Sequence, residues 1–124
     1  MTVDDLLERA RSRLRRVEPA EVEDELARGA VLVDIRADSQ RAADGLVPGA
    51  VFIPRNVLEW RCDPSSPHRD PQVSDPSHRL ILMCDEGYQS SLAAATLQEL
   101  GLPHATDLVG GFQAWRAAGL PTTG

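Results

Sequence analysis

Cys84 stands at a position in the sequence where a sulfur atom can do chemistry. It ends the apolar run "RLILMC", and it is followed by the short polar segment "DEGYQ" and then by "SSLAAATLQELG", which has helical periodicity. A continuous apolar run is typical of a buried parallel strand. Ligands of parallel sheets gather at the carboxyl ends of the strands, so we interpret Cys84 as a candidate nucleophile at such an end.

The residues after Cys84 are suited to holding a negatively charged sulfur. Gly87 permits backbone angles that other residues resist, and the amide N–H groups of a loop this short can point inward as an anion-binding nest. Ser90 or Ser91 is expected to cap the following helix, whose N-terminal dipole favours negative charge. These features favour a thiolate, although a cysteine at the end of a strand is also often a small buried hydrophobe.

The rest of the chain alternates between helical and strand patterns. Thr2 and Asp5 form a capping-box pattern that begins an amphipathic helix, and residues 19–29 predict a second helix that begins at a proline and ends at a glycine. Strands are predicted at 30–35, 50–54 and 79–84, and a short strand with a turn at 104–111. Helices or helical turns are predicted at 36–45, 55–61, 90–101 and 112–119. The proline-rich residues 62–78 are expected to form a surface loop near the pocket.

This alternation predicts an α/β fold with three layers, in which helices cover both faces of a parallel sheet. A length of 124 residues with 42% hydrophobic content suits one domain. We expect residues 1–18 to be an N-terminal helix within the same domain as residues 19–124.

Charge and composition exclude several classes of protein. The net charge is -6, and all 13 basic residues are arginine, which argues against binding to nucleic acid. The charged N-terminus does not fit a secretory signal and no run is long enough to span a membrane, so we expect a cytoplasmic protein with reduced cysteines. Five arginines lie between Arg9 and Arg16, and we interpret them as a solvated helix face.

Four motifs in order, "VLVDIR", "GLVPGAVFIP", "CDEGYQSS" and "LVGGFQAWRAAGLP", resemble the rhodanese family of sulfurtransferases over about Pro19 to Pro121. The resemblance implies a small α/β domain without a cofactor, whose cysteine accepts a sulfane sulfur as a persulfide and passes it to a thiol or other nucleophile. Cys84 corresponds to that cysteine. The loop "CDEGYQ" would then bind the sulfur donor through Asp85, Glu86, Gly87, Tyr88 and Gln89, with Ser90 opening the helix. Asp34 and Arg36 match a structural pair of the family.

Two positions depart from the family pattern. Gln89 stands where the family loop commonly carries a basic residue, and Leu46 stands where a histidine is common. Asp85 and Glu86 also repel an anionic donor unless they point outward. Either thiosulfate or a persulfide is therefore a candidate donor, and the acidic pair favours a basic protein partner.

Arginines from outside the loop are candidates to replace the missing cation. Arg41 follows the strand that contains Asp34, and Arg61 precedes the proline-rich loop. Each is weighed against the simpler interpretation of a solvated surface arginine. Tyr88 is expected to shape the pocket mouth.

Several alternatives remain open. Cys62 is a candidate resolving partner for Cys84, or an incidental exposed thiol. The spacing of the two cysteines with His68 and His78 fits no compact zinc site, so no metal is predicted, and His104 is expected at the surface. A cysteine phosphatase or arsenate reductase needs an arginine clamp that positions 89 and 90 lack. A non-enzymatic binding or redox-sensing module is the third alternative.

Overall fold

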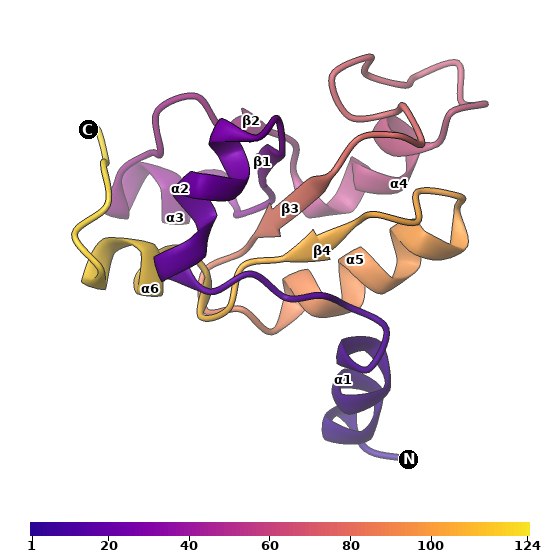
Figure 1. Cartoon of the computed structure of the whole chain (residues 1–124), viewed down its shortest axis with the longest axis horizontal. Helices are drawn as coiled ribbons and strands as arrows, with labels where there is room; N and C mark the ends of the chain where they lie inside the picture. The colour runs from indigo at the N-terminus through magenta and orange to yellow at the C-terminus, as the bar shows by residue number, and fades with distance from the viewer.

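A four-stranded parallel sheet forms the centre of the molecule. The computed structural model describes residues 1–124, and its strands are β1 (Val31–Asp34), β2 (Val51–Phe52), β3 (Leu80–Met83) and β4 (Thr106–Asp107). They run parallel in the order β2-β1-β3-β4 (Figure 1). β3 is therefore an interior strand, and its carboxyl end lies between those of β1 and β4.

Helices cover both faces of this sheet. On one face lie α4 (Leu58–Cys62) and α5 (Gln89–Glu99), and on the other lie α2 (Pro19–Ala27) and α6 (Gly111–Ala117). The short helix α3 (Asp38–Asp44) lies between β1 and β2 in the chain, and the 3-10 helix η1 (Arg55–Val57) lies between β2 and α4. The predicted three-layer α/β fold is confirmed. None of these helices is both long enough and apolar enough to cross a membrane.

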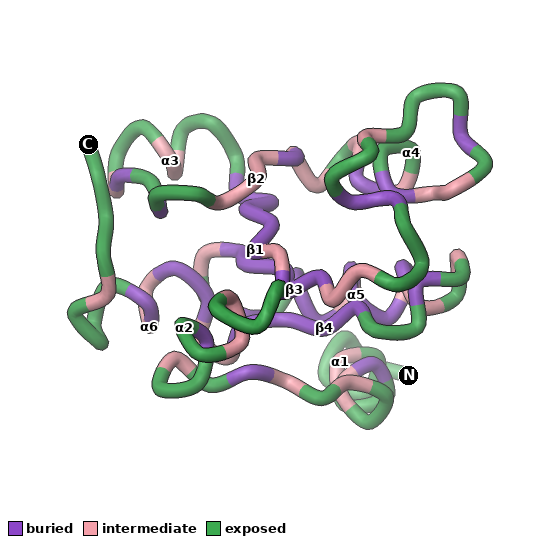
Figure 2. Tube along the Cα trace, turned by 45° about the horizontal axis from the view of Figure 1, so that its top comes forward, coloured by how far each residue is buried: buried purple, intermediate pink, exposed green.

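The strand sequences explain why both faces of the sheet are covered. Side chains alternate between the faces of a strand, and every residue of β3 is apolar and buried. Leu80, Leu82 and Cys84 join the apolar cluster under α4 and α5, whereas Ile81 and Met83 join the cluster under α2 and α6. Figure 2 shows the resulting buried centre, with the chain between α4 and β3 mostly exposed.

The N-terminal helix α1 (Val3–Arg11) begins with the predicted capping box, because Thr2 and Asp5 exchange side-chain and backbone hydrogen bonds. α1 packs against α5. The chain then passes β4, where Val17 forms a parallel bridge to Leu108. Residues 1–18 are thus in contact with the same sheet and helix that carry the cysteine loop.

Candidate active site

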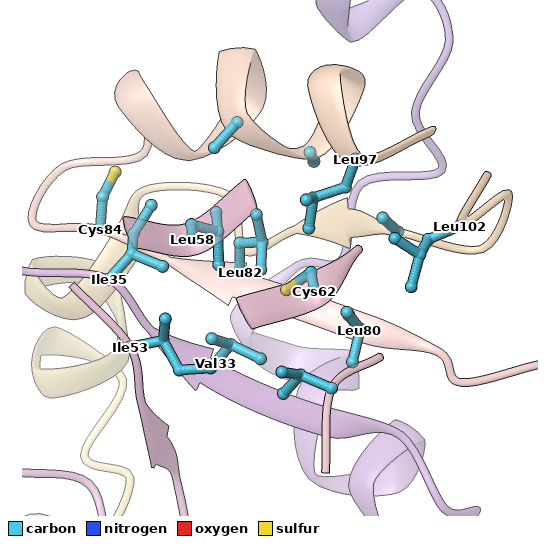
Figure 3. Packing of buried hydrophobic residues seen from close by; sticks show 14 residues of the cluster. Val33, Ile35, Ile53, Leu58, Cys62, Leu80, Leu82, Cys84, Leu97 and Leu102 are labelled. Carbon is cyan, nitrogen blue, oxygen red and sulfur yellow. The ribbon is translucent and has the colours of Figure 1, made fainter. Parts of the chain in front are cut away.

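The sulfur of Cys84 is held at the carboxyl end of β3 by backbone amides. Sγ accepts hydrogen bonds from the N–H of Gly87, with N at 3.1 Å, and from the N–H of Ser90, with N at 3.4 Å. Only 6% of Cys84 is exposed. Figure 3 shows its sulfur at one end of the apolar cluster, on the side of α5. The loop therefore curls back over the sulfur as the sequence predicts.

Gly87 can hold this position only because it lacks a side chain. Its φ is +87°, and a Cβ there would lie 2.6 Å from the backbone N of Gly110. Gly111 is equally restricted, since its Cβ would lie 2.5 Å from the carbonyl oxygen of Cys84. The N–H of Phe112 donates to that same oxygen at 2.8 Å. The beginning of α6 therefore supports the loop by close backbone packing.

One side chain of the loop is hydrogen-bonded to α6, and three others are exposed to solvent. Asp85 accepts a hydrogen bond from Nε2 of Gln113 at 2.9 Å, so its carboxylate is bound to α6. Glu86, Tyr88 and Gln89 are exposed, Tyr88 by 60%. These three are the side chains that the loop presents to an incoming molecule.

The expected serine cap of α5 is wrong. The helix begins at Gln89, and the N-cap residue Tyr88 makes no side-chain capping bond. The hydroxyls of Ser90 and Ser91 instead donate to Oδ2 of Asp107, at 2.7 and 2.8 Å. Asp107 is completely buried at the end of β4, and a buried carboxylate attracts hydroxyl donors more strongly than a neutral backbone group does.

Two arginines from the N-terminal segment complete this arrangement. Arg16 donates from Nε and Nη2 to the two carboxylate oxygens of Asp107, at 2.9 and 3.2 Å. Its Nη2 also donates to the carbonyl oxygen of Gly87 at 3.1 Å, and Arg11 donates to the same oxygen at 2.7 Å. Arg11 Nε donates to Oγ of Ser91 at 3.1 Å. Our interpretation of these arginines as a solvated face is wrong for Arg11 and Arg16.

Comparison with known protein families identifies the domain that carries this cysteine loop. The family model of the rhodanese-like domain matches residues 18–118. This chain belongs to the rhodanese family.

Relatives of this rhodanese include sulfurtransferases of similar length. The thiosulfate sulfurtransferase GlpE of Ectopseudomonas mendocina is 34% identical over 86% of this chain and 88% of its own. A sulfurtransferase of Allochromatium vinosum is 31% identical over 73% of this chain and 76% of its own. The chain is accordingly a rhodanese-type sulfurtransferase.

One solved structure also matches the N-terminal part of this rhodanese. It is a protein of unknown function from Rhodopseudomonas palustris, described as a possible tyrosine phosphatase. The TM-score is 0.90 and the identity 33%, and the match covers 98% of this chain and 94% of the other. A match of that extent includes most of α1.

The pair of Asp34 and Arg36 forms in the rhodanese domain and is completely buried. Arg36 donates from Nε and Nη2 to the two oxygens of Asp34, at 3.0 and 2.9 Å, and it also donates to the carbonyl oxygen of Gly45. Arg41 donates to the same carboxylate at 3.2 Å, and its guanidinium lies over the ring of Phe52. Arg41 is therefore bound to the end of β1, with no hydrogen bond to the cysteine loop.

Arg61 lies in α4 and donates to the carbonyl oxygen of His68 at 3.1 Å, so it supports the proline-rich loop. It has no hydrogen bond to residues 84–90 either. His104 is exposed as predicted. No three His, Cys, Asp or Glu side chains are grouped so that they could hold a metal ion.

Cys62 is not the exposed thiol on a loop that one of the two interpretations expects. It is the last residue of α4, and its side chain is fully buried in the apolar cluster instead of lying on the surface loop. Burial raises the pKa of its thiol to about 12, with further contributions from the charges of Glu59 and Asp70. Both cysteines are free thiols, and Figure 3 shows Leu58 drawn between them. A buried neutral thiol is poorly suited to resolve a persulfide at Cys84.

Proposed function

We propose that Cys84 carries a sulfane sulfur between a donor and a nucleophilic acceptor. The Cys84 thiolate attacks the outer sulfur of the donor, a new S–S bond forms, and the donor's own S–S bond breaks. With thiosulfate the bonding pair leaves on sulfite, and with a low-molecular-weight persulfide it leaves on a thiolate. An acceptor thiolate or cyanide then takes the outer sulfur, and the bonding pair returns to Cys84 as its thiolate.

The observation that supports this proposal is the pair of amide N–H groups directed at Sγ. The donors are Gly87 and Ser90, so the sulfur lies against the loop and the first turn of α5. Preorganised backbone N–H groups stabilise an anion without having to reorient during the reaction. The same amides serve the thiolate before transfer and the persulfide anion afterwards.

The donor is proposed only as a class, thiosulfate or a persulfide. The relatives named above include thiosulfate sulfurtransferases. Against thiosulfate, the loop from Asp85 to Ser90 contains no arginine or lysine, and the exposed Glu86 repels a dianion. The second carboxylate of the loop, that of Asp85, is held on the α6 side by Gln113.

The test is the intact mass of the reduced protein after brief incubation with thiosulfate or, separately, with a low-molecular-weight persulfide. Wild type and Cys62→Ser should gain one sulfur atom and lose it when cyanide or a thiol is added, whereas Cys84→Ser should gain none. The more productive donor defines the substrate class. Equal loss in both variants would contradict a single carrier and support a cysteine pair.

The same samples test the alternatives. A cysteine phosphatase would hydrolyse p-nitrophenyl phosphate, and no arginine of the loop is available to clamp a phosphoryl group. We expect no turnover above that of Cys84→Ser. If neither sulfur donor modifies Cys84 in the folded protein, the persulfide proposal fails, and a binding or redox-sensing role replaces it.

A basic protein partner is proposed as one acceptor or donor. Glu86 is exposed in the loop that follows Cys84, and the chain carries a net charge of -6. Opposite charge on a partner would steer the encounter. Transfer between the two proteins should then slow as salt is added, and a rate independent of salt would exclude this partner class.

A further inference from the structure

We propose that Arg11 and Arg16 are positioning residues for the sulfur-carrying loop, supplied from outside the family domain. The inference rests on the proposed function of Cys84. Both arginines precede residue 18, where the match to the rhodanese-like domain begins. Neither contacts the sulfur, so they act through the backbone that does.

The first link passes through Gly87. Its N–H donates to Sγ of Cys84, and its carbonyl oxygen accepts from Arg11 at 2.7 Å and from Arg16 at 3.1 Å. Gly87 has no side chain, so its backbone can rotate more freely than that of the other loop residues. Its φ of +87° is a conformation that residues with side chains rarely adopt. Two guanidinium groups on its carbonyl oxygen therefore fix the residue whose N–H must point at the sulfur.

The second link passes through Asp107. Arg16 binds both oxygens of this carboxylate, and the carboxylate accepts the hydroxyl of Ser90, whose N–H is the second donor to Sγ. A planar guanidinium fits a carboxylate in this two-bond arrangement, which an ammonium group cannot reproduce. Arg16 thus reaches both amide donors, one through a carbonyl oxygen and one through Asp107 and Ser90.

The contacts of the arginines favour a role in positioning the loop over a role as the missing donor-binding cation. The guanidinium groups lie on the carbonyl side of Gly87, and Arg11 also bonds Oγ of Ser91 inside the first turn of α5. Its charge lies near the ring of Tyr88, 5.6 Å from the centroid. Their removal should therefore slow the chemical step while binding of the donor changes little.

The experiment compares the double variant Arg11→Gln/Arg16→Gln with Arg9→Gln/Arg15→Gln. The control removes the same two charges from the same segment, at exposed arginines whose side chains make no hydrogen bond. Steady-state kinetics with a persulfide donor should show kcat about 10- to 100-fold lower in the first variant, with KM within about twofold. The control should match the wild type.

Hydrogen exchange of the backbone separates loop positioning from overall stability. In the Arg11→Gln/Arg16→Gln variant, the amides of Gly87 and Ser90 should exchange faster, while those of β3 keep their wild-type protection. Because Arg16→Gln leaves the buried Asp107 without its cation, Arg11→Gln alone is the second variant, and it leaves no buried charge unpaired. It should raise exchange at Gly87 and lower kcat by a smaller factor, and Arg11→Lys should restore part of both.

Three outcomes would overturn the inference. They are an unchanged kcat in both arginine variants, an equal loss in the Arg9/Arg15 control, and uniformly faster exchange throughout the sheet. If the wild type transfers no sulfur, the proposed function fails by itself. Exchange at Gly87 and Ser90 then still decides whether the arginines hold the loop.

Discussion

The two cysteines of this rhodanese lie in the same apolar cluster but have different surroundings. Cys84 is 6% exposed and Cys62 is fully buried, so the two residues are almost equally inaccessible to solvent. Sγ of Cys84 accepts two backbone N–H groups. The thiol of Cys62 has no hydrogen-bond donor, and the carboxylates of Glu59 and Asp70 disfavour its ionisation.

The two thiols therefore differ in their polar donors and hardly in their burial, since only Cys84 has amide N–H groups directed at its sulfur. Desolvation alone keeps a thiol neutral, whereas amides aimed at the sulfur offset the cost of its charge. Cys84 obtains such donors because it lies between the end of β3 and the beginning of α5. Cys62 ends a helix, where the free backbone groups are carbonyl oxygens instead of N–H groups.

The largest expected effect concerns the reactivity of the two thiols. At pH 8 a thiol with a pKa of about 12 is ionised in only about one molecule in ten thousand. Iodoacetamide should therefore alkylate Cys84 about 100-fold faster than Cys62 in the folded protein, as measured by peptide mass mapping. In urea the two rates should converge. Equal rates without denaturant would contradict the comparison.

Gly87→Ala should remove the advantage of Cys84 by turning an amide away from the sulfur. The added Cβ would meet the backbone N of Gly110 at 2.6 Å, so the loop has to shift. Loss of one preorganised donor should lower the rate of sulfur transfer about 100-fold. Gly29→Ala is the matched control, because its φ is +98° and a Cβ there meets nothing within 4 Å. It should lose about 1 kcal/mol of stability and keep full activity.

Cys62 should make stability depend on pH in a way that its replacement removes. Its folded pKa, about 12, lies above the ordinary value of 9.0, so its contribution is complete below pH 9 and is lost as the pH rises toward 12. Between these values the free energy of unfolding should fall by up to about 1.4 kcal/mol per pH unit relative to Cys62→Ala. Urea titrations of both proteins measure this. Parallel pH profiles would count against a neutral, buried Cys62.

The smallest expected effect concerns the exposed residue Gln89, at the end of the loop that follows Cys84. The buried Cys62 has no such exposed loop beside it. Gln89→Arg places a cation on the exposed first residue of α5, beside the proposed donor site. KM for thiosulfate should fall about threefold, and KM for a neutral persulfide donor should not change. An unchanged KM for both donors would show that charge at residue 89 does not limit thiosulfate binding.

The positions of the strands and of Cys84 could be predicted because their signals are local. The apolar run of β3, the glycine of the loop and the helical periodicity that follows are adjacent in the sequence. Arg11 meets Gly87 across 76 residues, and only the packing of α1 on α5 brings them together. No spacing rule contains that contact, so the two arginines were interpreted as a solvated face.

The two other errors arose where tertiary contacts override a local rule. Ser90 and Ser91 fit the preference for serine at a helix start, but a buried carboxylate took their hydroxyls. Cys62 begins a proline-rich stretch that indicates exposure, whereas α4 continues to that residue and turns it inward. For the serines the deciding contact is one buried carboxylate, Asp107, and for Cys62 it is the apolar cluster under α4.

The arginine contacts have a consequence for where this domain can be said to begin. The family pattern starts at residue 18, yet a fragment cut there would lose the guanidinium of Arg16 that neutralises Asp107, and both cations on Gly87. A boundary drawn at residue 18 would thus also remove α1 and the backbone hydrogen bonds of Val17 beside β4, together with the arginine contacts to the cysteine loop. In this molecule the contacts that hold the cysteine loop therefore begin before the residue at which the match to the family begins.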